Sequence, residues 1–168
     1  PISNFGAIKN KLSKMIVKSF SCESISYRAG NDIENKIAEF QDSGISKNES
    51  ELKAIELFSV ECAICKIYGS EILDYVVDEG VQIYGGMGFS EEAPMARAYR
   101  DARISRIYEG TNEINRMLIV GTLLKRALKN EIPLFTEAAK VIDYVKNIEI
   151  IEEEDFFENL YSIIKRLK

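Results

Sequence analysis

The sequence predicts an all-α protein, built as an up-and-down bundle of helices followed by a C-terminal helical extension. Three observations carry this prediction. Apolar residues recur at helical spacing through most of the chain. Segments rich in glycine, proline or small polar residues separate the periodic stretches. No stretch shows a convincing strand pattern. With 168 residues, 46% of them hydrophobic, the chain is long enough to enclose a core and too apolar to be disordered.

Composition excludes several classes of function. Histidine is absent, so catalysis by histidine and histidine metal ligands are excluded, and we expect no metal site. The formal net charge of −5 gives no reason to expect a nucleic-acid partner. No apolar run reaches the roughly 18 residues that a transmembrane helix needs. Because the chain starts at Pro1 without a signal peptide or an initiator methionine, we expect a fragment or a processed product.

The cysteines predict a reducing compartment and free thiols. There are three, Cys22, Cys62 and Cys65. Cys62 and Cys65 form a C-x-x-C pattern, but it lies within a predicted helix and has no second pair. We therefore interpret them as small apolar residues of a helix face rather than as a redox or zinc site.

Two long helices are expected in the first half of the chain. The first runs from Phe5 to about Lys36, with Asn4 as its N-cap, and has one buried stripe. That stripe is Phe5, Ile8, Leu12, Met15, Ile16, Phe20, Ile25 and Tyr27. A polar loop is predicted over 41–48, and a second helix follows from Glu49 to about Tyr84. Its apolar side is Leu52, Ile55, Phe58, Ala63, Ile67, Ile72, Tyr75, Val76 and Ile83.

A glycine-dense turn is expected to end the second helix. Gly85, Gly86 and Gly88 can supply the left-handed conformation of a helix C-terminus and let the backbone approach a ligand closely. Pro94 then begins another helix. We expect this helix to direct Met95, Ala98, Tyr99 and Ile104 inward. The arginines that recur every three residues indicate a solvated or salt-bridged face; they are Arg97, Arg100, Arg103 and Arg106.

Tyr108, Glu109 and Gly110 interrupt the helical pattern again. Thr111 is the expected N-cap of a helix through about Ala127, with Ile114, Leu118, Ile119 and Leu123 on one face. A glutamate in such a connection is usually a solvated charge. Here the flanking residues and the adjacent helix N-terminus predict a fixed, partly desolvated segment. In apolar surroundings the pKa of Glu109 would rise, and its carboxylate could act as a base toward a carbon acid.

The charge balance changes after residue 129. The part from Asn130 onward has 5 basic and 9 acidic residues, whereas the part before it has 17 and 18. We therefore expect a core helical domain over 1–129 and a helical extension over 130–168. The extension should hold a helix over about Leu134–Lys146, an acidic solvated linker over Glu149–Asp155, and a last helix to Leu167.

Three motifs in the right order and spacing make the sequence resemble a known family. They are Gln82–Phe89, Arg100–Ile104 and Ile107–Ile114. Together they closely resemble the C-terminal helical domain of the acyl-CoA dehydrogenases, over roughly Ile2–Ala127. The segment Lys66–Glu71 also fits that domain. The sequence beyond Lys129 is similar to the very-long-chain branch, whose members carry an extra C-terminal helical region.

The resemblance implies roles for particular residues. Glu109 matches the catalytic base, which removes the α-proton of a fatty acyl-CoA thioester while the β-hydride passes to FAD. Tyr108 and Gly110 match substrate-binding positions. A first FAD-contacting segment, toward a cofactor held mainly by the neighbouring subunit, matches Gln82, Ile83, Tyr84, Gly85 and Gly86. A second FAD-contacting segment matches Thr111, Asn112 and Glu113.

The resemblance also implies a setting and leaves alternatives open. It implies β-oxidation of straight-chain acyl-CoA, electron-transferring flavoprotein as acceptor, and a homo-oligomer in bacterial cytoplasm or the mitochondrial matrix. The isolated fragment should neither bind FAD tightly nor turn over substrate. Without the first helix of the family domain, an apolar groove is expected along Phe5, Ile8, Leu12, Phe58 and Ile72. The alternatives are an acyl-CoA oxidase and a non-catalytic helical interaction module.

Overall fold

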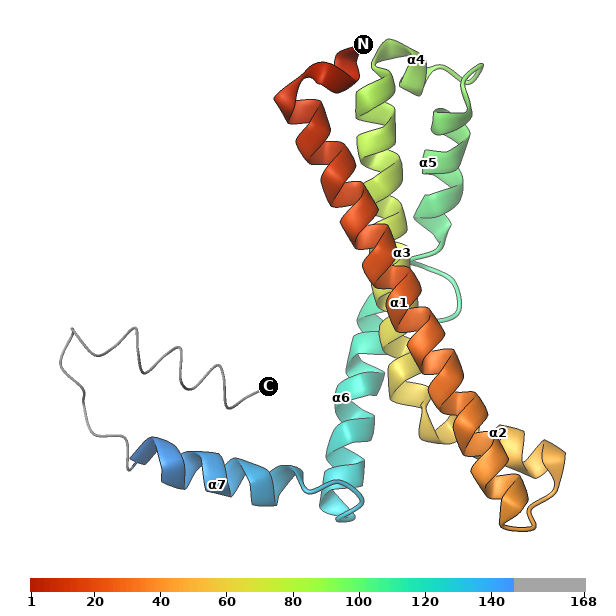
Figure 1. Ribbon diagram of the computed structural model, residues 1–168, viewed down its shortest axis with the longest axis vertical. Coiled ribbons are helices and arrows are strands. Elements are labelled where there is room, and N and C mark those ends of the chain that lie inside the picture. The colour runs from red at the N-terminus through yellow and green to blue at the C-terminus, as the bar shows by residue number, and fades with distance from the viewer. Residues whose placement is uncertain (147–168) are drawn as a thin grey trace. The chain divides into compact units, whose positions relative to one another are not determined.

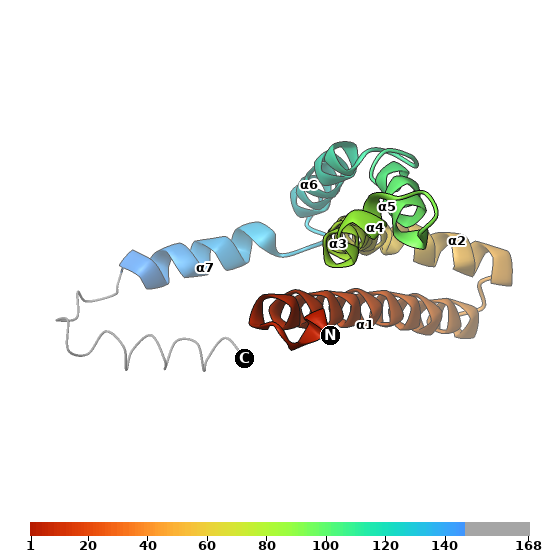
Figure 2. The same ribbon diagram turned by 90° about the horizontal axis from the view of Figure 1, so that it is seen from above.

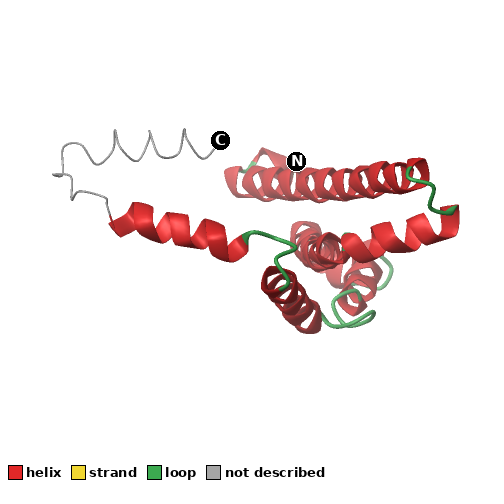
Figure 3. Cartoon of the chain, turned by 90° about the horizontal axis from the view of Figure 1, so that it is seen from below, coloured by secondary structure: helices red, strands yellow, loops and turns green. Residues whose placement is uncertain are grey.

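The structure is a computed structural model that describes residues 1–146. Every regular element in this range is a helix, as Figure 3 shows, so the predicted all-α class is confirmed. The chain divides into two units, 1–125 and 126–168, and each is described by itself. The predicted boundary at 129/130 falls a few residues later, beyond the end of α6 (Asn112–Leu128).

In the first unit, a central helix connects the other elements. Its helices are η1 (Ile2–Asn4), α1 (Gly6–Asp42), α2 (Lys47–Leu57), α3 (Ser59–Tyr84), α4 (Gly86–Phe89), α5 (Pro94–Ile104) and the start of α6. The central helix is α3, which lies between α1 and α5 and packs against both (Figures 1 and 2). In the second unit, α7 spans Leu134–Lys146, as predicted. The predicted acidic linker and last helix lie outside the described residues.

The first helix is longer than predicted. It begins at Gly6 after the extended backbone of Phe5, and no side chain caps it, so the predicted Asn4 cap is wrong. It continues to Asp42, which shortens the predicted loop to residues 43–46. Gly44, at φ +86°, makes this short turn possible because glycine tolerates a left-handed backbone. The amide of Ile45 donates to the carbonyl of Phe40 at 3.1 Å and closes the end of the helix.

The predicted single buried stripe of α1 is wrong for half of its members. Four of them are half-buried: Ile8, Leu12, Met15 and Ile25. The other four are exposed: Phe5, Ile16, Phe20 and Tyr27. At 3.6 residues per turn these two groups lie on different sides of the helix. Within the first unit, α2 and α3 pack against only one of those sides, so the second apolar side remains open in that unit.

The predicted second helix is divided at Phe58, where α2 ends and α3 begins with a backbone at φ −92°, ψ 19°. The helical hydrogen bonds continue across this break, since the amide of Phe58 donates to the carbonyl of Ala54 at 3.0 Å. The core includes Ala54, Val60, Ala63, Ile67, Ile72 and Val77. The predicted inward positions of Leu52 and Ile55 are wrong, because both are exposed. Ile72 is buried and therefore does not line an open groove.

Within residues 1–146, no helix combines the length and the hydrophobicity that crossing a membrane requires.

Candidate functional site

The end of α3 presents an open stretch of main chain. Gly85 caps the helix at φ +60° and ψ −141°, a conformation that strongly favours glycine, as the sequence predicted. A Cβ atom added to Gly85 or Gly86 would meet nothing within 4 Å, so a ligand could approach this backbone. The neighbouring Gln82 and Tyr84 are exposed and Ile83 is half-buried.

Gly88, unlike the two glycines before it, is needed for packing. It is buried, and a Cβ atom there would lie 2.3 Å from the carbonyl oxygen of Val81. The absence of a side chain therefore lets α4 lie directly on the last turn of α3. The glycine-dense motif thus combines open positions for a ligand with one position needed for packing.

The start of α5 and the arginines along it lie largely as the sequence predicts. Pro94 occupies the first turn of α5. Arg100 donates to Glu91 at 2.7 Å, and Arg106, beyond the helix end, donates to Asp74 of α3 at 2.9 Å, so part of the arginine row is salt-bridged. The inward prediction is wrong for Tyr99 and Ile104, which are both exposed.

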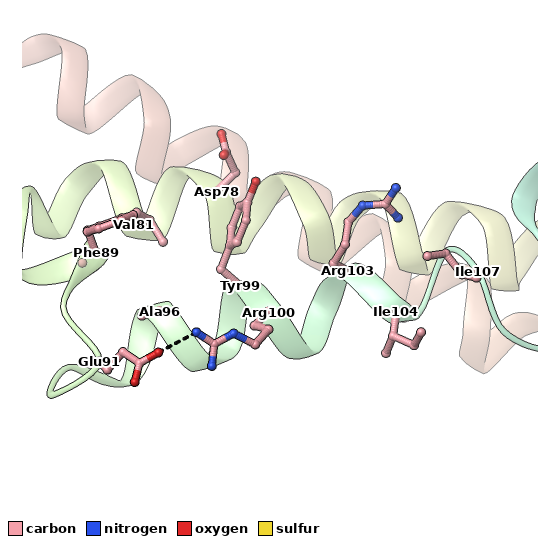
Figure 4. A pocket seen from close by; sticks show the side chains of 11 residues that line it. Asp78, Val81, Phe89, Glu91, Ala96, Tyr99, Arg100, Arg103, Ile104 and Ile107 are labelled. Carbon is pink, nitrogen blue, oxygen red and sulfur yellow. Dashed lines mark hydrogen bonds and ion pairs between the residues drawn. The ribbon is translucent and has the colours of Figure 1, made fainter.

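A groove of about 780 Å³ follows α3 and α5. Figure 4 shows apolar side chains along it and the ion pair between Glu91 and Arg100 at one end. It is lined by Asp78, Val81, Gly88, Phe89, Glu91, Ala96, Tyr99, Arg100, Arg103, Ile104 and Ile107. None of these is a residue to which the sequence assigned a role in catalysis or cofactor binding.

The connection between α5 and α6 contains two consecutive left-handed residues. Glu109 has φ +56° and Gly110 has φ +81°. A left-handed backbone costs a non-glycine residue roughly 1–2 kcal/mol. The predicted partial desolvation is wrong for the described chain, because Tyr108 and Glu109 are both exposed in the connection between α5 and α6.

Hydrogen bonds to the carbonyl oxygen of Gly110 hold this connection in place. The ammonium group of Lys66, on α3, donates to it at 2.8 Å, and the side-chain amide of Asn115 donates to it at 2.8 Å. Lys66 also donates to Oδ1 of Asn112 at 2.8 Å. A small cavity of about 240 Å³ adjoins this cluster and includes Lys66 and Glu109 in its wall. No sequence pattern indicates a role for Lys66 or Asn115.

Asn112 is almost completely buried, with 1% of its surface exposed. Its amide nitrogen donates to the hydroxyl of Ser70 at 2.9 Å and to the carboxylate of Glu71 at 3.3 Å. The hydrogen bond from Arg116 holds the pKa of Glu71 below its ordinary value. Since the Asn112 side chain points into this network, any contact of this residue with FAD would have to come from its main chain.

The neighbours of Asn112 remain accessible. Thr111 acts as the N-cap of α6, as predicted, because its hydroxyl oxygen accepts the amide of Ile114 at 3.3 Å. Glu113 is exposed. The hydrogen bond from its own backbone amide, followed by that from the Thr111 hydroxyl, lowers the pKa of the Glu113 carboxyl. Thr111 and Glu113 could therefore present polar groups to a ligand.

The two predicted FAD-contacting segments do not meet in this chain. The Glu109 connection lies beside Lys66, Ser70 and Asp74, in the middle of α3. Gln82–Gly86 lies at the C-terminal end of the same helix. At 1.5 Å per residue this separation is about 20 Å along the axis. The first segment is therefore the C-terminal end of α3, whereas the second is the start of α6, packed against the middle of α3.

The cysteines remain free thiols within residues 1–146. Burial, followed by the influence of Cys62 and Cys22, raises the pKa of the Cys65 thiol and so disfavours its thiolate. Among the described residues, no group of three or more acidic or cysteine side chains could hold a metal ion.

Comparison with known proteins relates most of the chain to a single family. The family model described as the C-terminal domain of acyl-CoA dehydrogenase matches residues 1–124. A probable acyl-CoA dehydrogenase of Bacillus subtilis (strain 168) is 45% identical over 138 residues, which are 82% of this chain and 23% of that protein. The human mitochondrial very long-chain specific acyl-CoA dehydrogenase is 35% identical over 153 residues, 83% of this chain and 21% of that protein.

The same relationship appears among solved structures. An acyl-CoA dehydrogenase from Bacillus anthracis, crystallised in complex with FAD, superposes with a TM-score of 0.80 at 42% identity. That match covers 91% of this chain and 26% of the solved chain. The chain thus spans about a quarter of the length of the relatives that it matches.

Proposed function

Because the chain belongs to the acyl-CoA dehydrogenase family, we propose that it is part of an enzyme that dehydrogenates straight-chain fatty acyl-CoA between Cα and Cβ. The observation that carries this proposal is the Glu109–Gly110 connection. It places a carboxylate on a backbone fixed by hydrogen bonds, in the sequence context that resembles the family's catalytic base. In the reaction, Glu109 takes the α-proton of the thioester onto its carboxylate.

The other residues of the connection bind and orient the substrate. Tyr108 is half-exposed beside Glu109 and offers an aromatic surface, while the main chain of Gly110 allows close approach. The Glu109 side chain is exposed in this chain, so the surroundings that raise the basicity of its carboxylate must come from other parts of the enzyme.

The accessible residues fit FAD as the redox cofactor. When bound, FAD would accept the β-hydride. Gly85 and Gly86 leave their main chain open, which suits a phosphate-containing ligand, and Thr111 and Glu113 offer polar groups at the start of α6. The separation of about 20 Å along α3 supports the view that these segments contact two different FAD molecules.

That arrangement supports a homo-oligomer, in which Gln82–Gly86 serves the cofactor of a neighbouring subunit. Electron-transferring flavoprotein is the proposed acceptor, and the bacterial cytoplasm or the mitochondrial matrix the proposed location.

The test is the visible spectrum of the protein expressed from its complete reading frame, titrated with acyl-CoAs of increasing chain length. We expect a yellow flavoprotein that bleaches with acyl-CoA, and a Glu109→Gln variant that retains flavin but bleaches at least about 1000-fold more slowly. Glu92→Gln, an exposed glutamate in the turn before α5, is the matched control and should behave like the parent.

Other results would contradict the proposal. Bleaching of Glu109→Gln at the parental rate would exclude Glu109 as the base. Absence of bound flavin from the complete protein would instead favour a helical interaction module. Release of hydrogen peroxide in proportion to substrate would identify an acyl-CoA oxidase.

A further inference from the structure

We propose that Lys66 is a positioning residue, which fixes the backbone of Glu109 by clamping Gly110 to Asn112. The inference rests on the proposed function, because it concerns how the proposed base is held. It assigns a role to a lysine that lies on a different helix from the base and is separated from Gly110 by 44 positions in the sequence.

The hydrogen bonds of Lys66 point to this role. Its ammonium group donates to two neutral acceptors, the carbonyl oxygen of Gly110 and Oδ1 of Asn112, each at 2.8 Å. Among residues 1–146, no carboxylate forms an ion pair with Lys66, unlike Lys11 or Lys53. A hydrogen bond from a charged donor to a neutral carbonyl is stronger than one from a neutral donor, so it holds its acceptor in place more firmly. The ammonium group therefore holds the turn rather than balancing a negative charge.

The second acceptor of the clamp is itself rigid. Asn112 is 1% exposed, and Ser70 and Glu71 hold its amide nitrogen at 2.9 and 3.3 Å. The Ser70 hydroxyl in turn donates to the carbonyl of Ile67 within α3. Lys66 and Ser70 lie one turn apart on α3, so both can reach the same side chain. Asn112 consequently has no freedom to rotate away from Lys66.

The base has no comparable support of its own. Within the described residues, the carboxylate of Glu109 has no hydrogen-bond or ion-pair partner. Its position depends on the backbone of Glu109 and Gly110, both of which are left-handed. Such backbone persists only where the surroundings hold it. Loss of the clamp would let the turn relax, and a displacement of about 1 Å at a reacting group can slow a reaction about 100-fold.

The experiment compares variants of the flavin-loaded enzyme expressed from the complete reading frame. Lys66→Met removes the ammonium group and keeps the length of the side chain, while Lys66→Arg restores a charged donor. Lys53→Met is the matched control, because Lys53 pairs with Glu49 on the exposed side of α2, away from the turn. Flavin content, acyl-CoA dissociation constant and the bleaching rate at saturating acyl-CoA are measured for each variant.

We expect Lys66→Met to retain flavin and to bind acyl-CoA within about threefold of the parent, but to bleach about 100-fold more slowly. Lys66→Arg should recover at least a tenth of the parental rate, and Lys53→Met should match the parent. A purely structural lysine would affect flavin content and binding as much as rate, and that result would overturn the proposal. A parental bleaching rate in Lys66→Met would also overturn it.

A milder variant keeps the test decisive if Lys66→Met does not fold. Ser70→Ala loosens Asn112 while leaving Lys66 intact, and it should slow bleaching about threefold to tenfold with flavin retained. In that case a parental rate in Ser70→Ala would overturn the proposal.

Glu109→Gln, measured in parallel, separates this inference from the proposed function. If Glu109→Gln bleaches at the parental rate, both fail. If Glu109→Gln is inactive while Lys66→Met matches the parent, only the role of Lys66 fails.

Discussion

At the residue scale, the proposed base occupies a position that is unfavourable for its own backbone. Glu109 is one of two non-glycine residues with positive φ in the described chain, the other being Asn130. Asparagine tolerates this conformation comparatively well, whereas glutamate has no such preference. Strain of this kind often marks a functional position, which agrees with the role proposed for Glu109.

Replacing Glu109 by glycine should therefore raise stability and remove activity together. Because glycine adopts φ +56° without strain, Glu109→Gly should increase the free energy of unfolding by up to about 1 kcal/mol. Urea denaturation of the protein measures this change, and flavin bleaching measures the loss of activity. As a control, Glu113→Gly in the first turn of α6 should lower stability by up to about 1 kcal/mol. A marked loss of stability in Glu109→Gly would contradict the strain argument.

Glu71 should make the protein sensitive to acid. The hydrogen bond from Arg116 lowers the pKa of Glu71 in the folded state below its ordinary value of 4.5. The ion pair of Glu71 therefore contributes fully to the free energy of unfolding above the ordinary pKa. That contribution disappears as the pH falls through the lower pKa of the folded state. Glu71→Gln should lower the free energy of unfolding at neutral pH by less than about 1 kcal/mol, because the pair is substantially exposed.

Between neutral pH and pH 3, the free energy of unfolding should fall less in Glu71→Gln than in the parent. Urea denaturation across this range tests the expectation, with Glu92→Gln as a control that should keep the parental acid profile. Equal acid sensitivity in Glu71→Gln and the parent would show that Glu71 contributes nothing.

At the scale of elements, two glycines of α3 and α4 permit close packing, but their neighbours differ. A Cβ atom on Gly88 would meet the main chain of Val81, whereas one on Gly80 would meet the terminal methyl group of Met95, also at 2.3 Å. Main chain cannot move away without disturbing α3, but a methionine side chain can adopt another rotamer. The same 2.3 Å approach should therefore reduce the free energy of unfolding more at Gly88 than at Gly80.

The pair Gly88→Ala and Gly80→Ala tests this difference. Gly88→Ala should lower the free energy of unfolding by about 2–3 kcal/mol through overpacking. Gly80→Ala should change it by less than about 1 kcal/mol, because the gain in helix propensity offsets the movement of Met95. Chemical denaturation of both variants provides the comparison. Similar losses in the two would show that Met95 cannot move.

At the scale of the whole molecule, the described chain leaves large apolar side chains exposed. On α1 they form an outer face that consists of Ile16, Val17, Phe20 and Tyr27, each at least 63% exposed. Their positions at 3.6 residues per turn place them on one side of the helix. Apolar patches of this kind commonly mark contact surfaces. The homo-oligomer expected from the sequence would give this face a partner.

Sedimentation velocity tests the association directly. We expect the parent to sediment above the mass of a monomer, and Phe20→Lys, which places a charge in the outer face of α1, to shift the distribution toward monomer. Asn48→Lys, at an exposed position of α2, controls for the added charge. A parent that remains monomeric at the highest concentration would contradict the expectation.

Features that depend on a few neighbouring residues can be predicted from the sequence alone. They are the all-α class, the helix end at Gly85, the helix starts at Pro94 and Thr111, and the bounds of α7. These follow from backbone preferences of single residues and from local hydrogen bonds, which are encoded where they occur. The three family motifs can likewise be recognised in the sequence, because their order and spacing are properties of the chain.

Tertiary packing determines which apolar residues are buried and how the turn at Glu109 is held. The periodicity of α1 includes two apolar sides, and only packing against α3 selects Leu12 over Phe20. The clamp joins Lys66 to Asn112 across 46 positions of sequence, and no local pattern encodes a contact over that distance. Burial and long-range hydrogen bonds are properties of how helices meet, so they appear only when the helices are placed together.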